Sequence, residues 1–339
     1  TIGNSNVALG TSALSSNVSG DRSTALGYNA LSAQNNGTST YDADNTAVGY
    51  NAMVNITTGI RNVAIGSGAL DAEDTGSRNV AIGYGTLSTL NYDGTAYNIA
   101  IGYQAGTLIT TGTFNTIIGA LAGDALTEAN NNVVLGYGAL GLDTLGSRNT
   151  AIGTSALESQ NFTSATNSYN TVVGFEAGSS VTTGIGNTFV GGTCGNGTDD
   201  GGNNTAVGYL TLRGNAGNGN AAFGRQALDV CTGGSNTALG TESGKSVTSG
   251  SNNIFVGRDS GFTGSPGGNI TTGSNEIVLG DENITEAHIQ VDWTVASDAR
   301  DKTDFTALDL GLDFVKNLQP VTYKWDKRSK YGDKSAEGY

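Results

Sequence analysis

A short pattern of polar, small and aliphatic positions recurs along the chain. Residues 62–66 show it as Asn, Val, Ala, Ile and Gly. We call the Gly that ends each copy the closing Gly. Nine of the 15 intervals between successive closing glycines are 17 residues long, as between Gly49 and Gly66, and we call this interval the regular unit. Small and β-branched residues bounded by Gly predict a short β-strand. The 16 closing glycines are Gly10, Gly27, Gly49, Gly66, Gly83, Gly102, Gly119, Gly136, Gly153, Gly174, Gly191, Gly208, Gly224, Gly240, Gly257 and Gly280.

A 17-residue unit holds about two short strands and their turns, and it has no room for a helix as well. Such a unit cannot bury a core alone, whereas stacked units can, with each strand hydrogen-bonded to the next at about 4.8 Å. The recurring Ala fits a thin interior in which backbones approach closely. We therefore predict an all-β fold: a repetitive parallel β-roll or β-helix, a solenoid rod, over residues 1–283.

The recurring Asn suits either a ladder of stacked side chains or a turn cap, and the pattern alone does not separate the two. The last copy has Glu276 in its place, which predicts an atypical terminal coil. The chain opens in register within a unit, because residues 1–6 match residues 57–62. Solenoids need capped ends, so we expect more protein, or a partner, before Thr1.

Three units are longer than the regular unit and lack the Gly that usually stands three residues before the Asn. Asp42, Thr95 and Asn167 occupy these positions. Loops that project from a rigid scaffold often carry binding residues, and Tyr mixed with Asn and Ser is typical of paratopes. The alternative is a tolerated loop length without function. The aromatic residues of the insertions are our candidates for binding: Tyr41, Tyr92, Tyr97, Phe162 and Tyr169.

Tyr also follows the closing Gly in six units. We interpret this series as a structural stacking ladder or a subunit contact rather than as a platform for a ligand. The six residues are Tyr28, Tyr50, Tyr84, Tyr103, Tyr137 and Tyr209.

Composition narrows the class of protein. Gly makes up 53 of 339 residues and Pro only two, which fits many regular turns and excludes collagen. Residues 1–296 hold 8 Lys and Arg against 22 Asp and Glu, so this part of the chain carries the whole net charge of −14 and should repel nucleic acid. No apolar run reaches the roughly 20 residues that span a bilayer, so we expect no membrane insertion.

Residues of catalytic or metal-binding type are few. The single histidine, His288, argues against a His-based metal or triad site. Cys194 stands at the Ala position of its unit and Cys231 at a different phase, which argues against a disulfide between them. No pair of carboxylates and no phosphate-binding loop stands out. We expect no cofactor and no metal.

Thin coils leave most residues near a surface, so a rod of this kind needs partners to bury enough apolar area. We expect a homo-oligomer, with three-fold closure as the leading arrangement.

The C-terminal segment, residues 297–339, is a different module because its charges balance, with 8 basic and 8 acidic residues. Pro320 ends a predicted helix, and residues 321–325 predict a strand. Before this segment, apolar residues at every second position predict a half-buried neck strand within residues 284–296. Three residues at helical spacing form one helix face: Leu310, Phe314 and Leu318.

Two stretches of this segment are specific: Ser-Asp-Ala-Arg-Asp-Lys over residues 297–302 and Pro-Val-Thr-Tyr-Lys-Trp over residues 320–325. With the Gly-Leu-Asp of the helix between them, they resemble the start of the intramolecular chaperone domain of phage tail fibres and tail spikes, also called the endosialidase chaperone or peptidase S74 domain. The repeats resemble both the β-roll heads of trimeric autotransporter adhesins and the arrays of phage tail-fibre proteins.

The chaperone resemblance implies a small α+β segment that trimerises, sets the register of three chains and then cuts itself off through a Ser-Lys dyad. It implies that Ser297 is the nucleophile and Lys302 its base, with Asp298 and Arg300 in support. The alternative is that the segment persists as a fold element without cleavage.

Together the resemblances imply a structural, receptor-binding virion fibre, the distal tail fibre of a bacteriophage. Such a homotrimer would lie outside the cell. It would bind a host cell-surface glycan or protein through its insertions, and other tail or baseplate proteins at its N-terminal side. It would be no enzyme beyond a single self-cleavage. The alternatives are a bacterial trimeric surface adhesin and a glycan-depolymerising tail spike.

Overall fold

The computed structural model describes residues 3–35, 37, 41–290 and 318, and these residues contain no helix. The chain divides into two compact units, Thr1–Glu286 and Ala287–Tyr339. The first unit is a β-solenoid, and its main sheet has 16 parallel strands in chain order. The predicted all-β solenoid is therefore confirmed.

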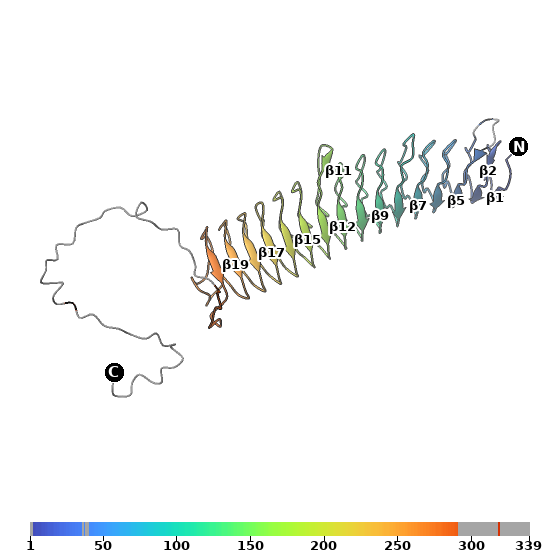
Figure 1. Cartoon of the computed structure of the whole chain (residues 1–339). Helices are drawn as coiled ribbons and strands as arrows, with labels where there is room; N and C mark the ends of the chain where they lie inside the picture. The colour runs from blue at the N-terminus through green and yellow to red at the C-terminus, as the bar shows by residue number, and fades with distance from the viewer. Residues whose placement is uncertain (1–2, 36, 38–40, 291–317, 319–339) are drawn as a thin grey trace. The chain divides into compact units, whose positions relative to one another are not determined.

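Each strand of the main sheet has three residues and pairs with the strands of the coils before and after it (Figure 1). The strands lie along one side of the rod, and the turns lie along the other. In order, the strands are β1 (Val7–Leu9), β3 (Thr24–Leu26), β5 (Thr46–Val48), β6 (Val63–Ile65), β7 (Val80–Ile82), β8 (Ile99–Ile101), β9 (Thr116–Ile118), β10 (Val133–Leu135), β12 (Thr150–Ile152), β14 (Thr171–Val173), β15 (Thr188–Val190), β16 (Thr205–Val207), β17 (Ala221–Phe223), β18 (Thr237–Leu239), β19 (Ile254–Val256) and β20 (Ile277–Leu279).

The interior is lined by small residues, as the recurring Ala predicts. In every strand after β1 the middle residue is buried, and equivalent positions pair in register, as Ala64 does with Ala81. Where the middle residue is large, glycines make room for it. A Cβ at Gly195 would lie 2.5 Å from the ring of the fully buried Phe189. Side-chain sizes therefore complement one another across each coil, which keeps the packing close.

The repeat Asn acts both as a ladder and as a cap. The backbone N–H of Asn62 donates to Oδ1 of Asn45 in the preceding coil at 2.9 Å. Its Nδ2 donates to the carbonyl of Gly76, the turn residue before the next Asn, at 2.8 Å. The side-chain amide of Asn62 thus satisfies two backbone groups of the next coil, because its Oδ1 also accepts the N–H of Asn79 at 2.9 Å. Such groups would be costly to leave unpaired. Most coils repeat this pattern, whereas Nδ2 of Asn149 and of Asn204 has no partner among the described residues. Besides Glu276, Ser23 also replaces the Asn, and Gln34 Nε2 donates to its hydroxyl at 3.0 Å.

The Gly that closes each strand occupies a conformation that L-residues rarely adopt. Gly136 has φ +141°, and its N–H donates to the carbonyl of Ile118 at 2.8 Å. A Cβ at this position would lie 2.4 Å from the carbonyl oxygen of Gly153 in the next coil. Coils stacked this closely leave no space for a side chain, which explains why the sequence repeats Gly there.

The three insertions replace the usual tight turn by pairing with the preceding coil. β2 (Gly20–Asp21) pairs with β4 (Tyr41–Asp42), and β11 (Gly146–Ser147) pairs with β13 (Thr166–Asn167). In the second insertion, Ser77 and Thr95 form an isolated bridge. The second and third insertions lie on the side of the rod opposite the main sheet, where the loop between β12 and β13 projects furthest (Figure 1).

The predicted elements of the C-terminal segment lie mostly outside the described residues. Residues 284–290 form no strand, and Ile289 is 52% exposed. The remainder of the predicted neck, residues 291–296, lies outside the described part of the chain. The predicted strand over residues 321–325 also lies outside it, and so does the predicted helix face, of which only Leu318 is described. The neck strand, the helix and the small α+β segment therefore stay predictions.

Candidate functional site

Tyr41, in the first insertion, holds its loop in place and exposes only part of its ring. It lies in β4, is half-buried, and donates its hydroxyl to the carbonyl of Thr57 at 3.2 Å. Burial also raises the pKa of the Tyr41 hydroxyl. The side chain thus ties the insertion to the next coil, and only part of its ring is open to a ligand.

Tyr92 and Tyr97, in the second insertion, are both exposed, at 36% and 48%. Tyr97 directly precedes Asn98, so it belongs to the regular coil rather than to the inserted residues. The guanidinium of Arg78 lies 5.6 Å from the centre of its ring, and the ring stacks on Phe114 at 5.6 Å. Three successive coils therefore build one exposed stack of a cation and two aromatic rings.

The third insertion contributes one exposed and one buried ring. Tyr169 is 55% exposed, and the guanidinium of Arg148 lies 5.5 Å from its ring centre. Phe162 is only 7% exposed, and its backbone N–H donates to Oδ1 of Asp143 at 3.2 Å. The loop folds back onto the preceding coil, so Phe162 offers little surface to a receptor in this structure.

The five predicted aromatic residues do not come together in one site. Their insertions precede β5, β8 and β14, and the intervening coils of β6, β7, β9, β10 and β12 separate them along the rod. Any contact through them would occur at three separate places.

Two interior carboxylates stabilise turns rather than forming a catalytic pair. Glu73 and Asp143 occupy interior positions that hold Leu, Ile or Val in several other coils, and both are fully buried. Glu73 accepts the N–H of Gly76 at 2.7 Å, and Asp143 accepts Nε2 of Gln160 at 2.7 Å. Burial raises the pKa of both carboxyl groups, against the effect of these hydrogen bonds. The two groups lie in different coils and cannot act together on one bond.

Both cysteines are buried thiols, which for Cys194 agrees with its place at the Ala position of its unit. Cys194 and Cys231 are free and fully buried. Desolvation raises the pKa of Cys194 to about 12 and that of Cys231 to about 11. Both are therefore protonated at neutral pH and are poor nucleophiles.

The residue after the closing Gly is an exposed aromatic in seven coils, one more than the six tyrosines that the sequence singles out. Each is between 48% and 58% exposed. Adjacent members stack, with ring centres 5.4 Å apart for Tyr28 and Tyr50 and 5.6 Å apart for Tyr84 and Tyr103. The predicted stacking is confirmed for these pairs. We call this series the aromatic row: Tyr28, Tyr50, Tyr84, Tyr103, Tyr137, Phe175 and Tyr209.

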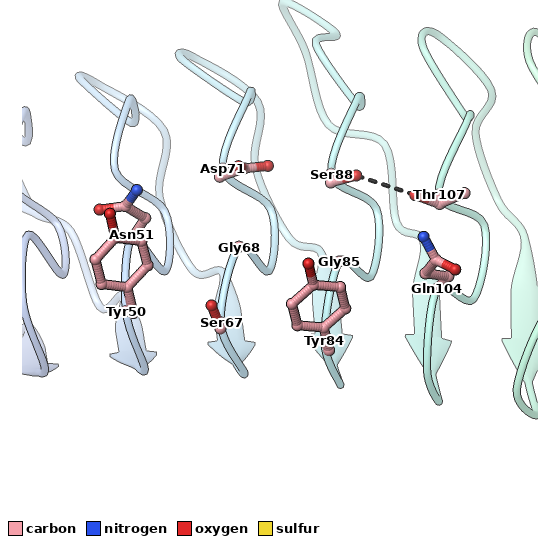
Figure 2. A pocket seen from close by; sticks show the side chains of 10 residues that line it. All are labelled: Tyr50, Asn51, Ser67, Gly68, Asp71, Tyr84, Gly85, Ser88, Gln104 and Thr107. Atoms are coloured by element: carbon pink, nitrogen blue, oxygen red, sulfur yellow. Dashed lines mark hydrogen bonds between the residues drawn. The ribbon is translucent and has the colours of Figure 1, made fainter.

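A shallow groove of about 310 Å³ lies within the aromatic row, where Ser67 separates two of its members. Figure 2 shows the rings of Tyr50 and Tyr84 on the same side of the rod, with Asp71 and Ser88 in a second line farther along each coil. Burial raises the pKa of the Asp71 carboxyl. The lining residues are Tyr50, Asn51, Ser67, Gly68, Asp71, Tyr84, Gly85, Ser88, Gln104 and Thr107.

The outer face of the main sheet carries an apolar residue in every coil, beside first-position residues that are Thr in half of the strands. The third residue of every strand points outward and is aliphatic or aromatic, with Leu135 at 42% and Leu239 at 53% exposure. Soluble monomers rarely expose a long apolar strip, so this face marks an interaction surface. We call it the apolar ladder: Leu9, Leu26, Val48, Ile65, Ile82, Ile101, Ile118, Leu135, Ile152, Val173, Val190, Val207, Phe223, Leu239, Val256 and Leu279.

The predicted self-cleavage residues, Ser297, Asp298, Arg300 and Lys302, lie outside the described residues. Within the described part of the chain, no three His, Cys, Asp or Glu side chains gather as a metal site. The same part holds no helix that could cross a membrane.

Comparison with known proteins finds a family match at the C-terminal end. Residues 297–338 match the chaperone of endosialidase family, peptidase S74. This is the segment whose motifs carry the resemblance, so that part of the sequence interpretation is supported. A chaperone segment of this kind implies assembly of the chain with itself. No curated protein and no solved structure matches the chain.

Proposed function

We propose that the chain is the rod of a homotrimeric virion fibre that attaches a bacteriophage to its host. The observation that carries the proposal is the order of its parts: a solenoid of 16 stacked strands followed by a segment that matches the chaperone of endosialidase. A chaperone that registers several chains suits a rod whose single coils are too thin to bury much apolar area. The fibre would lie outside the cell, on the virion.

The apolar ladder supports self-association because it presents apolar side chains at every coil over about 70 Å of rod. Copies of the same chain have the same coil spacing, so their ladders can pack in register along the whole length. A chaperone that fixes the register of the chains would favour such an arrangement. We assign the ladder as the surface through which the copies pack.

Attachment through the insertions is tested by competition. The exposed members of the predicted set are Tyr92, Tyr97 and Tyr169. Preincubating host cells with the purified chain is expected to reduce adsorption of the intact particle by about tenfold. A variant whose three long coils are shortened to the length of the regular unit is expected to compete more weakly, because it lacks part of the contact surface. Equal competition by both proteins would contradict binding through the insertions.

Self-cleavage is proposed at Ser297, with Lys302 as the base that takes its proton. A lysine can act in this way only if its surroundings lower its pKa. Replacing Ser297 with alanine in a chain that extends through the complete chaperone is expected to leave one long product on a denaturing gel. The unsubstituted chain is expected to give two shorter products. Identical band patterns would contradict cleavage at this residue.

A further inference from the structure

In part of the aromatic row the aromatic residues recur at every second coil, whereas the strand pattern recurs at every coil. Over seven successive coils, an aromatic residue alternates with a small one at the position after the closing Gly. The seven residues are Tyr103, Ala120, Tyr137, Thr154, Phe175, Gly192 and Tyr209. The alternation is hidden in the sequence, because an insertion of four residues lies between Thr154 and Phe175 and a shortened unit follows Tyr209.

Backbone hydrogen bonds fix this alternation in space. The N–H of Leu121 donates to the carbonyl of Tyr103 at 2.9 Å, and the N–H of Ser155 donates to that of Tyr137 at 2.9 Å. Equivalent bonds link each coil to the next, so every position of the row advances by one coil, about 4.8 Å. Successive aromatic rings of the alternating part are therefore about 9.6 Å apart along the rod.

Packing against a second copy of the chain accounts for the apolar ladder but not for the aromatic row. Packing between identical rods favours the same kind of residue in every coil, and the ladder has it in all 16 strands. The row instead leaves a gap at every second coil of its alternating part. The groove lies just before the alternating part, where Ser67 makes the same gap between Tyr50 and Tyr84. It is lined by the amides of Asn51 and Gln104 and the carboxylate of Asp71. Within the groove, Oδ1 of Asn51 accepts from Nδ2 of Asn29 at 3.2 Å, and the hydroxyls of Ser88 and Thr107 pair at 3.0 Å.

We infer that the aromatic row binds an extended, uncharged, β-linked glycan that lies along the rod. Aromatic faces stack on the C–H faces of sugar rings, and nearby amides and carboxylates pair with sugar hydroxyls. In a ribbon-like β-linked chain, successive sugars turn over, so the same face recurs at every second ring. Rings at every second coil match that repeat, whereas an aromatic at every coil would not.

The negative charge of the groove and of the surrounding rod disfavours the binding of anionic glycans. Asp71 is the only charged residue among the ten that line the groove. Residues 1–296, which include the whole row, carry the entire net charge of −14. A carboxylate in a strongly acidic rod repels sulfated or uronic acid chains but accepts neutral hydroxyls. Several weak platforms in line along one glycan would combine to give useful affinity.

This inference rests on the proposed attachment function and names a ligand class and a site distinct from the insertions. It is tested by affinity electrophoresis of the full chain in native gels. The gels contain soluble glucomannan, mixed-linkage β-glucan, dextran or alginate. We expect retardation by at least one of the two neutral β-linked polymers, and none by the α-linked dextran or the anionic alginate.

Two variants locate the binding on the row. Replacing Tyr84 with alanine is expected to weaken binding about fivefold, and replacing Tyr84, Tyr137 and Tyr209 together is expected to weaken it about 100-fold. Ile185→Ala is the control, because Ile185 is 44% exposed but precedes strand β15 instead of following a strand. The control should bind as the unsubstituted chain does.

The outcomes separate this inference from the proposed function. Loss of retardation in the triple variant, with an unchanged oligomeric mass, supports a glycan site on the row. The inference is overturned if the unsubstituted chain migrates unchanged in both neutral β-linked gels. It is also overturned if Ile185→Ala weakens binding as much as the variants of the row do. Dissociation of the triple variant into single chains overturns it too, because the row would then be a subunit contact. If the chain assembles and competes for host cells but binds none of these polymers, the glycan inference fails and the proposed fibre function is unaffected.

Discussion

Gly136→Ala is expected to lower the free energy of unfolding by about 4 kcal/mol. Two effects add up. The φ of +141° belongs to a region that is essentially restricted to Gly, and the new Cβ would lie 2.4 Å from the carbonyl oxygen of Gly153. That oxygen belongs to a backbone held by the sheet, where the N–H of Gly153 donates to Leu135 at 2.7 Å. Neither coil can move aside without breaking these bonds. Urea unfolding followed by circular dichroism measures the loss.

Gly138 provides the control, two residues farther along the same coil. Its φ is +62°, and a Cβ there would meet no atom within 4 Å. Gly138→Ala therefore carries only the left-handed backbone penalty, about 1 kcal/mol. Both variants should be compared at one protein concentration, because association contributes to apparent stability. Equal losses for the two variants would contradict the close stacking of the strand-closing glycines.

Placing charges on the apolar ladder is expected to dissociate the fibre into folded single chains. Leu135→Lys combined with Ile152→Lys puts two ammonium groups in the middle of the surface that we assign to packing between copies. Burying unpaired charges there would cost several kcal/mol, about 3 or more, which reduces the association constant more than 100-fold. Light scattering coupled to size exclusion would show the fall in mass. The circular dichroism should stay that of a β-protein, because both side chains point outward.

Leu142→Lys is the matched control for the ladder variant. Leu142 follows β10 in the coil of Leu135 and is 57% exposed, but it lies in the turn and not on the sheet face. We expect this variant to keep the mass of the unsubstituted protein. If the ladder variant also keeps that mass, the copies pack through another surface.

The regular part of the fold could be predicted from the sequence because period and geometry are tightly linked. One strand in every unit, with Ala at its centre and Gly at its end, leaves little choice but parallel stacking. The double role of the Asn could not be predicted, because its two hydrogen bonds reach backbone groups of neighbouring coils. Ser23 shows the same limit, since Gln34 from its own coil completes its interactions in place of the amide.

The surfaces were harder to predict, for different physical reasons. Phe162 is buried because its loop folds back onto the preceding coil, and a loop of that length carries no period from which its path could be inferred. Tyr97 and Tyr169 come from the regular coil and gain their contacts from arginines one coil earlier. The alternation of the aromatic row is present in the sequence, but it emerges only when coils of unequal length are aligned by their backbone pairing. The apolar ladder could have been found by the same alignment.

The most direct test of the fibre assignment is the mass of the full 339-residue chain in solution, measured by light scattering during size exclusion. A solenoid whose apolar ladder packs against copies of itself should give the mass of three chains, with the early elution of an elongated particle. The mass of one chain, at concentrations well above the micromolar range, would contradict the assignment.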